Sequence, residues 1–270
     1  MAYATGPGAA KIYYETFGES GPWVVLIQGL GLSSRFWFDL PDRLVKDTPT
    51  CRVVILDNRG VGRTDRPSGA YRMADMADDV VSVLDAAGID RAYVVGISMG
   101  GMIAQHVAIR HPKRVAGLVL MATTPGMPHG RLPSPRALAT LLSIPLTPKK
   151  RAGLALSRIL LPKKHQSRAK ELMWRWPAAL AAEPTHPRAF FSQFAAVIRH
   201  STGFRLRGIT CPTIVITGAE DILVPTHNSR ILAKKIPTAT LEILDDVAHG
   251  IPLMDERVVH RALGKLWARA

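Results

Sequence analysis

The sequence predicts an α/β fold with a doubly wound, mostly parallel sheet and a helical lid inserted in it. Apolar runs rich in Val and Ile alternate with amphipathic helical patterns, and one long basic stretch interrupts that alternation. The length of 270 residues is typical of an α/β domain that folds as one unit. With 47% hydrophobic and 21% charged residues, the composition is that of a globular protein. No apolar run reaches the ~18 residues of a membrane span.

The strands are predicted by runs of apolar residues with little alternation. Such runs are typical of parallel strands that helices cover on both faces. They lie at 23–27 (WVVLI), 52–56 (RVVIL), 92–96 (AYVVG), 115–121 (VAGLVLM), 213–217 (TIVIT) and 240–244 (TLEIL). The segment 11–20 (KIYYETFGES) alternates more and ends in turn-forming residues, so we expect an exposed antiparallel edge hairpin there.

The helices are predicted by apolar residues at helical spacing between these strands. The clearest pattern, 73–88, carries a stripe of Met, Val and Leu and ends at Gly88. Similar patterns cover 33–47, 102–111, 226–235 and 254–270. Strands that alternate with helices along the chain indicate a doubly wound sheet.

The segment 126–208 breaks this alternation. It contains nine prolines, and its fifteen Lys or Arg against two acids, Glu171 and Glu183, give it +13 of the total net charge of +14. We therefore divide the chain into a core, residues 1–125 and 209–270, and an inserted helical segment, residues 126–208. The simplest interpretation is a helical insertion packed over the carboxyl edge of the sheet. If this insertion has a function, we expect it to be a mobile lid that covers a substrate pocket.

Ser98 is the candidate nucleophile. It stands in Gly96-Ile97-Ser98-Met99-Gly100, a G-x-S-x-G pattern at a predicted strand-to-helix junction. In a nucleophile elbow this pattern forms a sharp turn that lifts the serine hydroxyl clear of the backbone. Gly96 and Gly100 are expected because a Cβ at either position would clash. The alternative is a glycine-rich turn whose serine caps a helix.

A weak nucleophile needs a base, and the base needs an orienting group. Of the nine histidines, His249 lies in the loop after the last predicted strand, whereas the others fall in or at flanking helices or in the segment 126–208. Asp221 follows the strand 213–217, so it precedes His249 in the order Ser, acid, His. We prefer Asp221 to Glu220, and we assign Asp57 to loop structure.

The tetrahedral intermediate of acyl transfer needs two backbone N–H donors for its oxyanion. One is expected from Met99, which follows the candidate nucleophile. The other is expected from Leu30, in the glycine-rich turn Gln28-Gly29-Leu30-Gly31 after the first parallel strand.

Taken together, these motifs resemble the α/β-hydrolase fold superfamily over nearly the whole chain. The matching stretches are QGLG (28–31), DNRGVGRTDRP (57–67), GISMGG (96–101), GAEDILVP (218–225) and AHG (248–250). The chain is most similar to lid-bearing esterases, enol-lactonases and cofactor-free haloperoxidases. The resemblance implies a triad of Ser98, His249 and Asp221 without a metal or organic cofactor. Two positions depart from the usual pattern: Gln28 where these relatives have His, and Thr64 where they often have Ser.

The expected reaction is attack by Ser98 on the carbonyl of a carboxylic ester, lactone or thioester, followed by hydrolysis of the acyl-enzyme. Within the family, a serine nucleophile argues against dehalogenase and epoxide hydrolase chemistry, which use an aspartate. Perhydrolase or haloperoxidase-like activity, carbon–carbon bond hydrolysis and a lyase reaction use the same motifs and stay open. A ligand receptor that retains a slow triad is the alternative from another class.

The expected partner is a small-molecule ester. The basic segment 126–208 favours either a merely solvated surface or an attraction for anionic substrates and weak binding to anionic interfaces. The sequence contains no nucleic-acid-binding motif, so no nucleic acid is expected, and Cys51 and Cys211 give no sign of a disulfide framework or metal site. Residues 1–11 lack the basic and apolar regions of a signal peptide, so we expect a cytoplasmic location.

Overall fold

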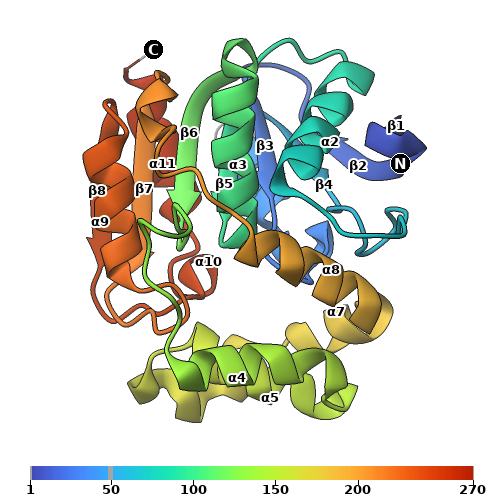
Figure 1. The fold of residues 1–270 in the computed structure, drawn as a ribbon, viewed down its shortest axis with the longest axis vertical. Coiled ribbons are helices and arrows are strands. Elements are labelled where there is room, and N and C mark those ends of the chain that lie inside the picture. Colours follow the sequence, from blue (N-terminus) through green and yellow to red (C-terminus); the bar gives the residue numbers. More distant parts are fainter. Residues whose placement is uncertain (1, 48–50, 270) are drawn as a thin grey trace.

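The computed structural model describes residues 2–47 and 51–269. Within these residues a central sheet has the strand order β1-β2-β4-β3-β5-β6-β7-β8 (Figure 1). The strands from β4 across to β8 pair in parallel, whereas β1 and β2 are antiparallel. Their bounds are Ala2–Thr5, Lys11–Phe17, Trp23–Ile27, Arg52–Leu56, Ala92–Ile97, Val115–Met121, Thr213–Gly218 and Ala239–Leu244.

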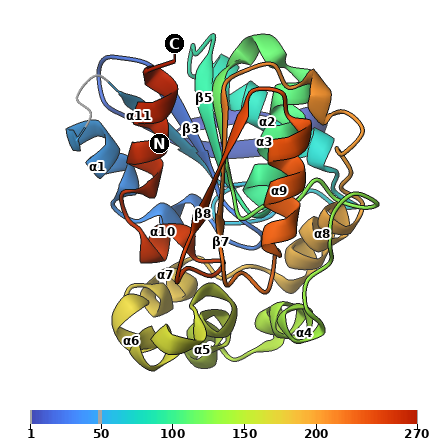
Figure 2. The same ribbon diagram turned by 90° about the vertical axis from the view of Figure 1, so that its left-hand side faces the viewer.

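Helices cover both faces of this sheet, as the near-continuous apolar strands predict. On one face α2 (Met73–Ala86), α3 (Met99–Arg110) and α9 (Thr226–Lys235) pack on the strands. On the other face α1 (Leu40–Asp47) and α11 (Val258–Trp267) bury their apolar sides (Figure 2). The predicted doubly wound α/β fold is therefore confirmed.

The differences from the expected elements lie at the amino-terminal edge and in two helices. The segment 11–17 is not the edge strand, because β1 pairs with its outer side and β4 with its inner side. The pattern 33–47 forms a short 3₁₀ helix, Ser34–Trp37, and then α1, because Phe38 at φ 50° interrupts the helical backbone. The pattern 254–270 likewise gives α10 (Ile251–Met254) and then α11.

Helices also fill the chain between β6 and β7, at one end of the sheet (Figure 1). They are α4 (Pro135–Ser143), α5 (Lys149–Leu160), α6 (Ala169–Leu172), α7 (Trp176–Ala182) and α8 (Pro187–Ile198). Two of these helices, α4 and α8, begin with a proline. Proline is tolerated there because the N–H of the first helical residue makes no hydrogen bond within the helix. A separate apolar cluster, which includes Leu156 and Trp176, holds this part to the core through Phe36 and Leu223.

No helix in the ranges 2–47 and 51–269 is both long enough and apolar enough to cross a membrane.

Candidate active site

Ser98 occupies a strained turn between β5 and α3. Its φ of 56° and ψ of −119° lie in a region that residues other than glycine rarely adopt. Neighbouring groups hold this geometry: the Ser98 amide donates to the carbonyl of Met121 at 2.9 Å, and Thr123 Oγ1 donates to the Ser98 carbonyl at 2.8 Å. The turn is therefore fixed by the adjacent strand β6 and the residues that follow it.

The glycines on either side of Ser98 stand where no side chain fits. A Cβ on Gly96 would lie 2.3 Å from the carbonyl oxygen of Gly100, and one on Gly100 would lie 2.1 Å from that of Ile27. Both contacts would be with backbone, which cannot rotate away. Glycine at these positions allows α3 to begin directly against the ends of β3 and β5.

His249 and Asp221 form a buried hydrogen-bonded pair. His249 Nδ1 lies 2.8 Å from Asp221 Oδ2, and each residue is only 5% exposed. Asp221 Oδ1 accepts from the amides of Leu223 and Val224 at 2.9 and 2.8 Å. Since an ionised carboxylate only accepts, His249 carries its proton on Nδ1 and leaves Nε2 with a free lone pair.

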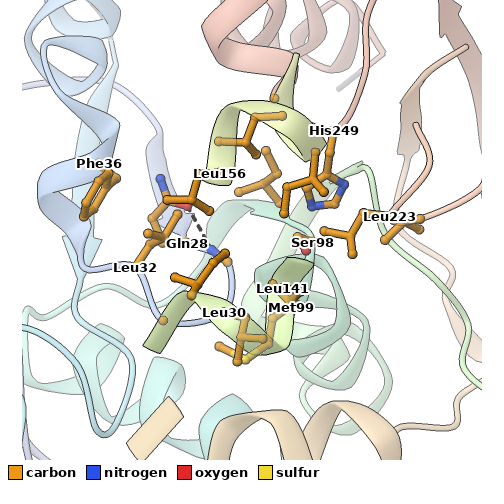
Figure 3. Close-up of a pocket in the computed structure, with 18 of the residues that line it drawn as sticks. Gln28, Leu30, Leu32, Phe36, Ser98, Met99, Leu141, Leu156, Leu223 and His249 are labelled. Carbon is orange, nitrogen blue, oxygen red and sulfur yellow. Dashed lines mark hydrogen bonds between the residues drawn. The ribbon is translucent and has the colours of Figure 1, made fainter. Parts of the chain in front are cut away.

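Ser98 and His249 both turn their side chains into one pocket (Figure 3). No hydrogen bond joins Ser98 Oγ to His249 among the described residues, although the acid–histidine bond is present. Such contacts are often long in enzymes without substrate and tighten when substrate binds. Ser98 and His249, predicted from separate motifs, thus line a single cavity, and Asp221 is joined to it through its hydrogen bond with His249.

The loop after β3 passes close to Ser98. A Cβ on Gly29 would lie 3.4 Å from Ser98 Cβ, within van der Waals contact, so this loop lies directly beside the serine. Gln28 Oε1 accepts from the Gly29 amide at 2.9 Å (Figure 3). Within the described residues, the amides of Leu30 and Met99 donate to no protein acceptor. The Gln28 side chain therefore occupies the amide of Gly29, whereas the amide of Leu30 has no acceptor among the described residues.

The comparison with protein families agrees with this geometry. The family model described as "alpha/beta hydrolase fold" matches residues 22–255. The chain belongs to the α/β-hydrolase fold family. The resemblance inferred from the five motifs is confirmed, and the chain is a hydrolase of this fold.

Individual relatives span almost the whole of this α/β hydrolase. "Putative carbamate hydrolase RutD" of Caulobacter sp. (strain K31) is 32% identical over 253 residues, which are 88% of this chain and 89% of the relative. The solved structure "Est816 as an N-Acyl homoserine lactone degrading enzyme" is 29% identical, with a TM-score of 0.80, and covers 97% of this chain and 99% of its own. The enol-lactonase from Burkholderia xenovorans LB400, at 24% identity and a TM-score of 0.84, covers 98% of this chain and 99% of its own, and shows the shared fold alone.

The pocket of this α/β hydrolase is large and mostly apolar. Its volume is about 1180 Å³, and residues from the core loops and from α4, α5 and α8 line it. Apolar side chains make up much of its wall, among them Leu30, Leu32, Phe36, Met99, Leu141, Leu156 and Leu223 (Figure 3). A cavity of this kind accommodates an extended apolar group next to Ser98.

Gln193 connects the helical segment to the loop after β3, a role that no sequence motif indicates. From α8, its Oε1 accepts from the Gly31 amide at 2.9 Å, and its Nε2 donates to the Arg59 carbonyl at 2.9 Å. Its side chain is fully buried. No motif marks Gln193, because its partner amide is 162 positions away in the chain.

A second polar cluster, around Asp57 and Glu183, connects the helical segment to the core. As expected, Asp57 is structural: it is buried and accepts from the amide and hydroxyl of Ser34 at 2.7 and 2.6 Å. Glu183, one of the two acids in 126–208, pairs with Arg35 at 3.0 Å and Arg63 at 3.5 Å. Burial opposes ionisation of Glu183, but the nearby Ser33 hydroxyl, the hydrogen bond from Arg35 and the charge of Arg63 bring its pKa below its usual value.

Proposed function

We propose that this hydrolase cleaves carboxylic esters or lactones with an extended apolar acyl group, through an acyl-enzyme on Ser98. The observation that carries the proposal is that a strained serine and a histidine held by a buried aspartate line the same apolar cavity of about 1180 Å³. Serine, base and orienting acid are the parts that acyl transfer requires.

In the proposed first step, His249 Nε2 takes the hydroxyl proton as Ser98 Oγ attacks the carbonyl carbon. Asp221 fixes the tautomer and stabilises the imidazolium, since its other oxygen is already held by two amides. The amides of Leu30 and Met99 receive the oxyanion, because neither donates to another described residue. Collapse of the intermediate expels the alcohol, which takes its proton from His249. Water then releases the acid by the same steps.

The apolar wall supports an acyl group of several carbons in preference to a small substrate. We propose that segment 126–208 acts as the lid, because α4, α5 and α8 supply much of this wall. The relative Est816 is described as degrading N-acyl homoserine lactones, which combine a lactone carbonyl with an acyl chain. Such lactones are therefore the first natural class to test.

Carbamate hydrolysis is the second candidate, because relatives with 32% identity carry that name. The same serine attack would serve a carbamate carbonyl. A small carbamate would leave most of the cavity unfilled, and this is why we rank the extended esters and lactones first.

The test compares initial rates on p-nitrophenyl esters from acetate to palmitate, a matched series of N-acyl homoserine lactones, and simple carbamates. Ser98→Ala is measured beside the wild type, with the exposed Ser68→Ala as control. We expect an optimum above acetate, and a fall of roughly 10⁴-fold or more in Ser98→Ala only. Turnover of carbamates but no ester or lactone would transfer the assignment to the second candidate. Ester turnover that survives in Ser98→Ala would contradict the mechanism.

A further inference from the structure

We propose that a basic, apolar surface at the mouth of the pocket docks onto anionic lipid membranes. This rim patch consists of residues 126–132, after β6, and residues 198–207, after α8 (Figure 1). The proposal concerns binding and does not depend on the reaction at Ser98.

The two stretches of the rim patch lie side by side. Ser201 Oγ donates to the Met127 carbonyl at 2.8 Å, and Gly126 forms a β-bridge with Ser201. The rings of His129 and Phe204 meet edge to face, with centroids 4.3 Å apart. The patch is thus one continuous surface although its parts are distant in sequence.

The rim patch exposes large apolar side chains that a monomeric surface normally buries. Met127 is 48% exposed, Leu132 70%, Ile198 65% and Phe204 77%. Met127, Leu132 and Ile198 also line the pocket, so these side chains border it where it meets the surface. A group of exposed apolar residues around an opening marks an interaction site better than scattered single residues do.

The charge of the rim patch has one sign. Arg131, Arg199, Arg205 and Arg207 are exposed, and neither stretch contains an acidic residue. Among the described residues, none of these arginines forms an ion pair. Lys235 adds a further cation, since its Nζ lies 5.9 Å from the Phe204 ring centroid and donates to the Gly203 carbonyl.

Apolar side chains interleaved with unpaired arginines complement an anionic bilayer. Phe, Leu, Ile and Met side chains enter the boundary between headgroups and acyl chains, while guanidinium groups bind the phosphates. A polynucleotide would satisfy the charges but would leave the aliphatic Leu132 and Ile198 in water. Docking in this orientation would place the pocket mouth against the lipid, so that an amphiphilic substrate could enter without crossing water.

The experiment is flotation of the purified protein with phosphatidylglycerol/phosphatidylcholine vesicles and with vesicles of phosphatidylcholine alone. We expect binding to the anionic vesicles only, and loss of that binding as salt rises from about 0.05 M to about 0.5 M. Ser98→Ala should bind as the wild type does, which separates this test from that of the proposed reaction. A single-stranded polynucleotide is included in a parallel binding assay.

Two variants with matched controls test the location. The triple variant Arg199→Ser, Arg205→Ser, Arg207→Ser should lower vesicle affinity by roughly a hundredfold, whereas Arg72→Ser, Arg91→Ser, Arg269→Ser, with the same change in net charge, should retain it. Phe204→Ser should lower affinity by about tenfold, and Leu154→Ser, at an exposed leucine of α5, should not. Far-ultraviolet circular dichroism and thermal unfolding check that each variant is folded.

Selective anionic binding that the patch variants lose and the controls keep supports the proposal. Absence of vesicle binding at low salt, equal binding to neutral vesicles, or equal loss in both arginine triples overturns it. Binding of the polynucleotide through the same arginines, without vesicle binding, overturns it in favour of a nucleic-acid partner.

Discussion

The turn around Ser98 and the helices between β6 and β7 differ in how strictly their residues are constrained. Gly100 leaves no room for even a methyl group, because a Cβ there would lie 2.1 Å from a backbone oxygen. The pocket wall supplied by α4 and α5 consists of leucines and other aliphatic groups, for which several residue types could substitute. The proposed chemistry therefore resides in short, sterically fixed motifs, whereas the shape of the substrate pocket resides in tertiary packing.

The strongest test of the fixed region is Asp221→Asn. The amide keeps the shape of the side chain but can favour the wrong tautomer of His249, so we expect kcat to fall about 10⁴-fold while the fold is retained. Steady-state rates on the best ester, with thermal unfolding in parallel, measure both quantities. A variant with near wild-type kcat would remove Asp221 from the proposed triad.

Gly100→Ala tests whether the turn is fixed by sterics. We expect a loss of about 3 kcal/mol in the free energy of unfolding, because the new Cβ would overlap the Ile27 carbonyl. Gly264→Ala in α11 is the control: nothing lies within 4 Å of its Cβ, so the change should be neutral or stabilising. Urea unfolding of the two variants makes the comparison, and similar stability losses would contradict it.

Two buried histidines, one on α3 and one after α8, pack together and predict that the stability of the fold depends on pH. His106 on α3 packs its ring 5.4 Å from that of His200, after α8. Burial, with nearby Arg205 and Arg110, lowers the pKa of His106 from 6.5 to about 4. Between pH 6.5 and about 4, the unfolded chain therefore binds a proton at His106 that the folded chain does not bind. The contribution of neutral His106 to the free energy of unfolding is complete above pH 6.5 and is lost as the pH falls toward 4. His106 alone should account for about 2 kcal/mol lost near pH 5.

Urea unfolding near pH 7 and at about pH 5 measures this loss. His106→Leu should reduce the difference in the free energy of unfolding between the two pH values. His186→Leu, at an exposed histidine, should leave that difference unchanged. An unchanged difference in His106→Leu would show that other groups cause the acid sensitivity.

Gln193→Leu gives the smallest effect and tests whether the helical segment positions the proposed oxyanion loop. Loss of its bonds to Gly31 and Arg59 should lower kcat by about tenfold, with little change in KM, because the loop amides would be less well oriented. Gln166→Leu, in the same segment, is the control. An equal loss of kcat in both variants, or a loss confined to KM, would mean that Gln193 acts on substrate binding or general stability.

The sequence predicted the sheet well because its strands are buried on both faces. The parallel runs at 23–27, 52–56 and 115–121 have the predicted bounds. The residues proposed for catalysis could also be predicted from the sequence, since each follows a strand in a recognisable motif. Gln193 could not, because its role depends on how α8 packs across the end of the sheet. The same holds for the exposed arginines and apolar groups of the rim patch, which only folding brings together.

The outer edges of the sheet have a consequence for self-association. On one side the last strand, β1, is only four residues long, and the antiparallel β2 lies behind it. On the other side β8 carries Glu242, which is held by Lys265 and Arg261 of α11. A very short strand on one edge and charged side chains on the other disfavour the addition of a strand from a neighbouring molecule. The long apolar strands that build this fold are thereby shielded from joining into aggregates.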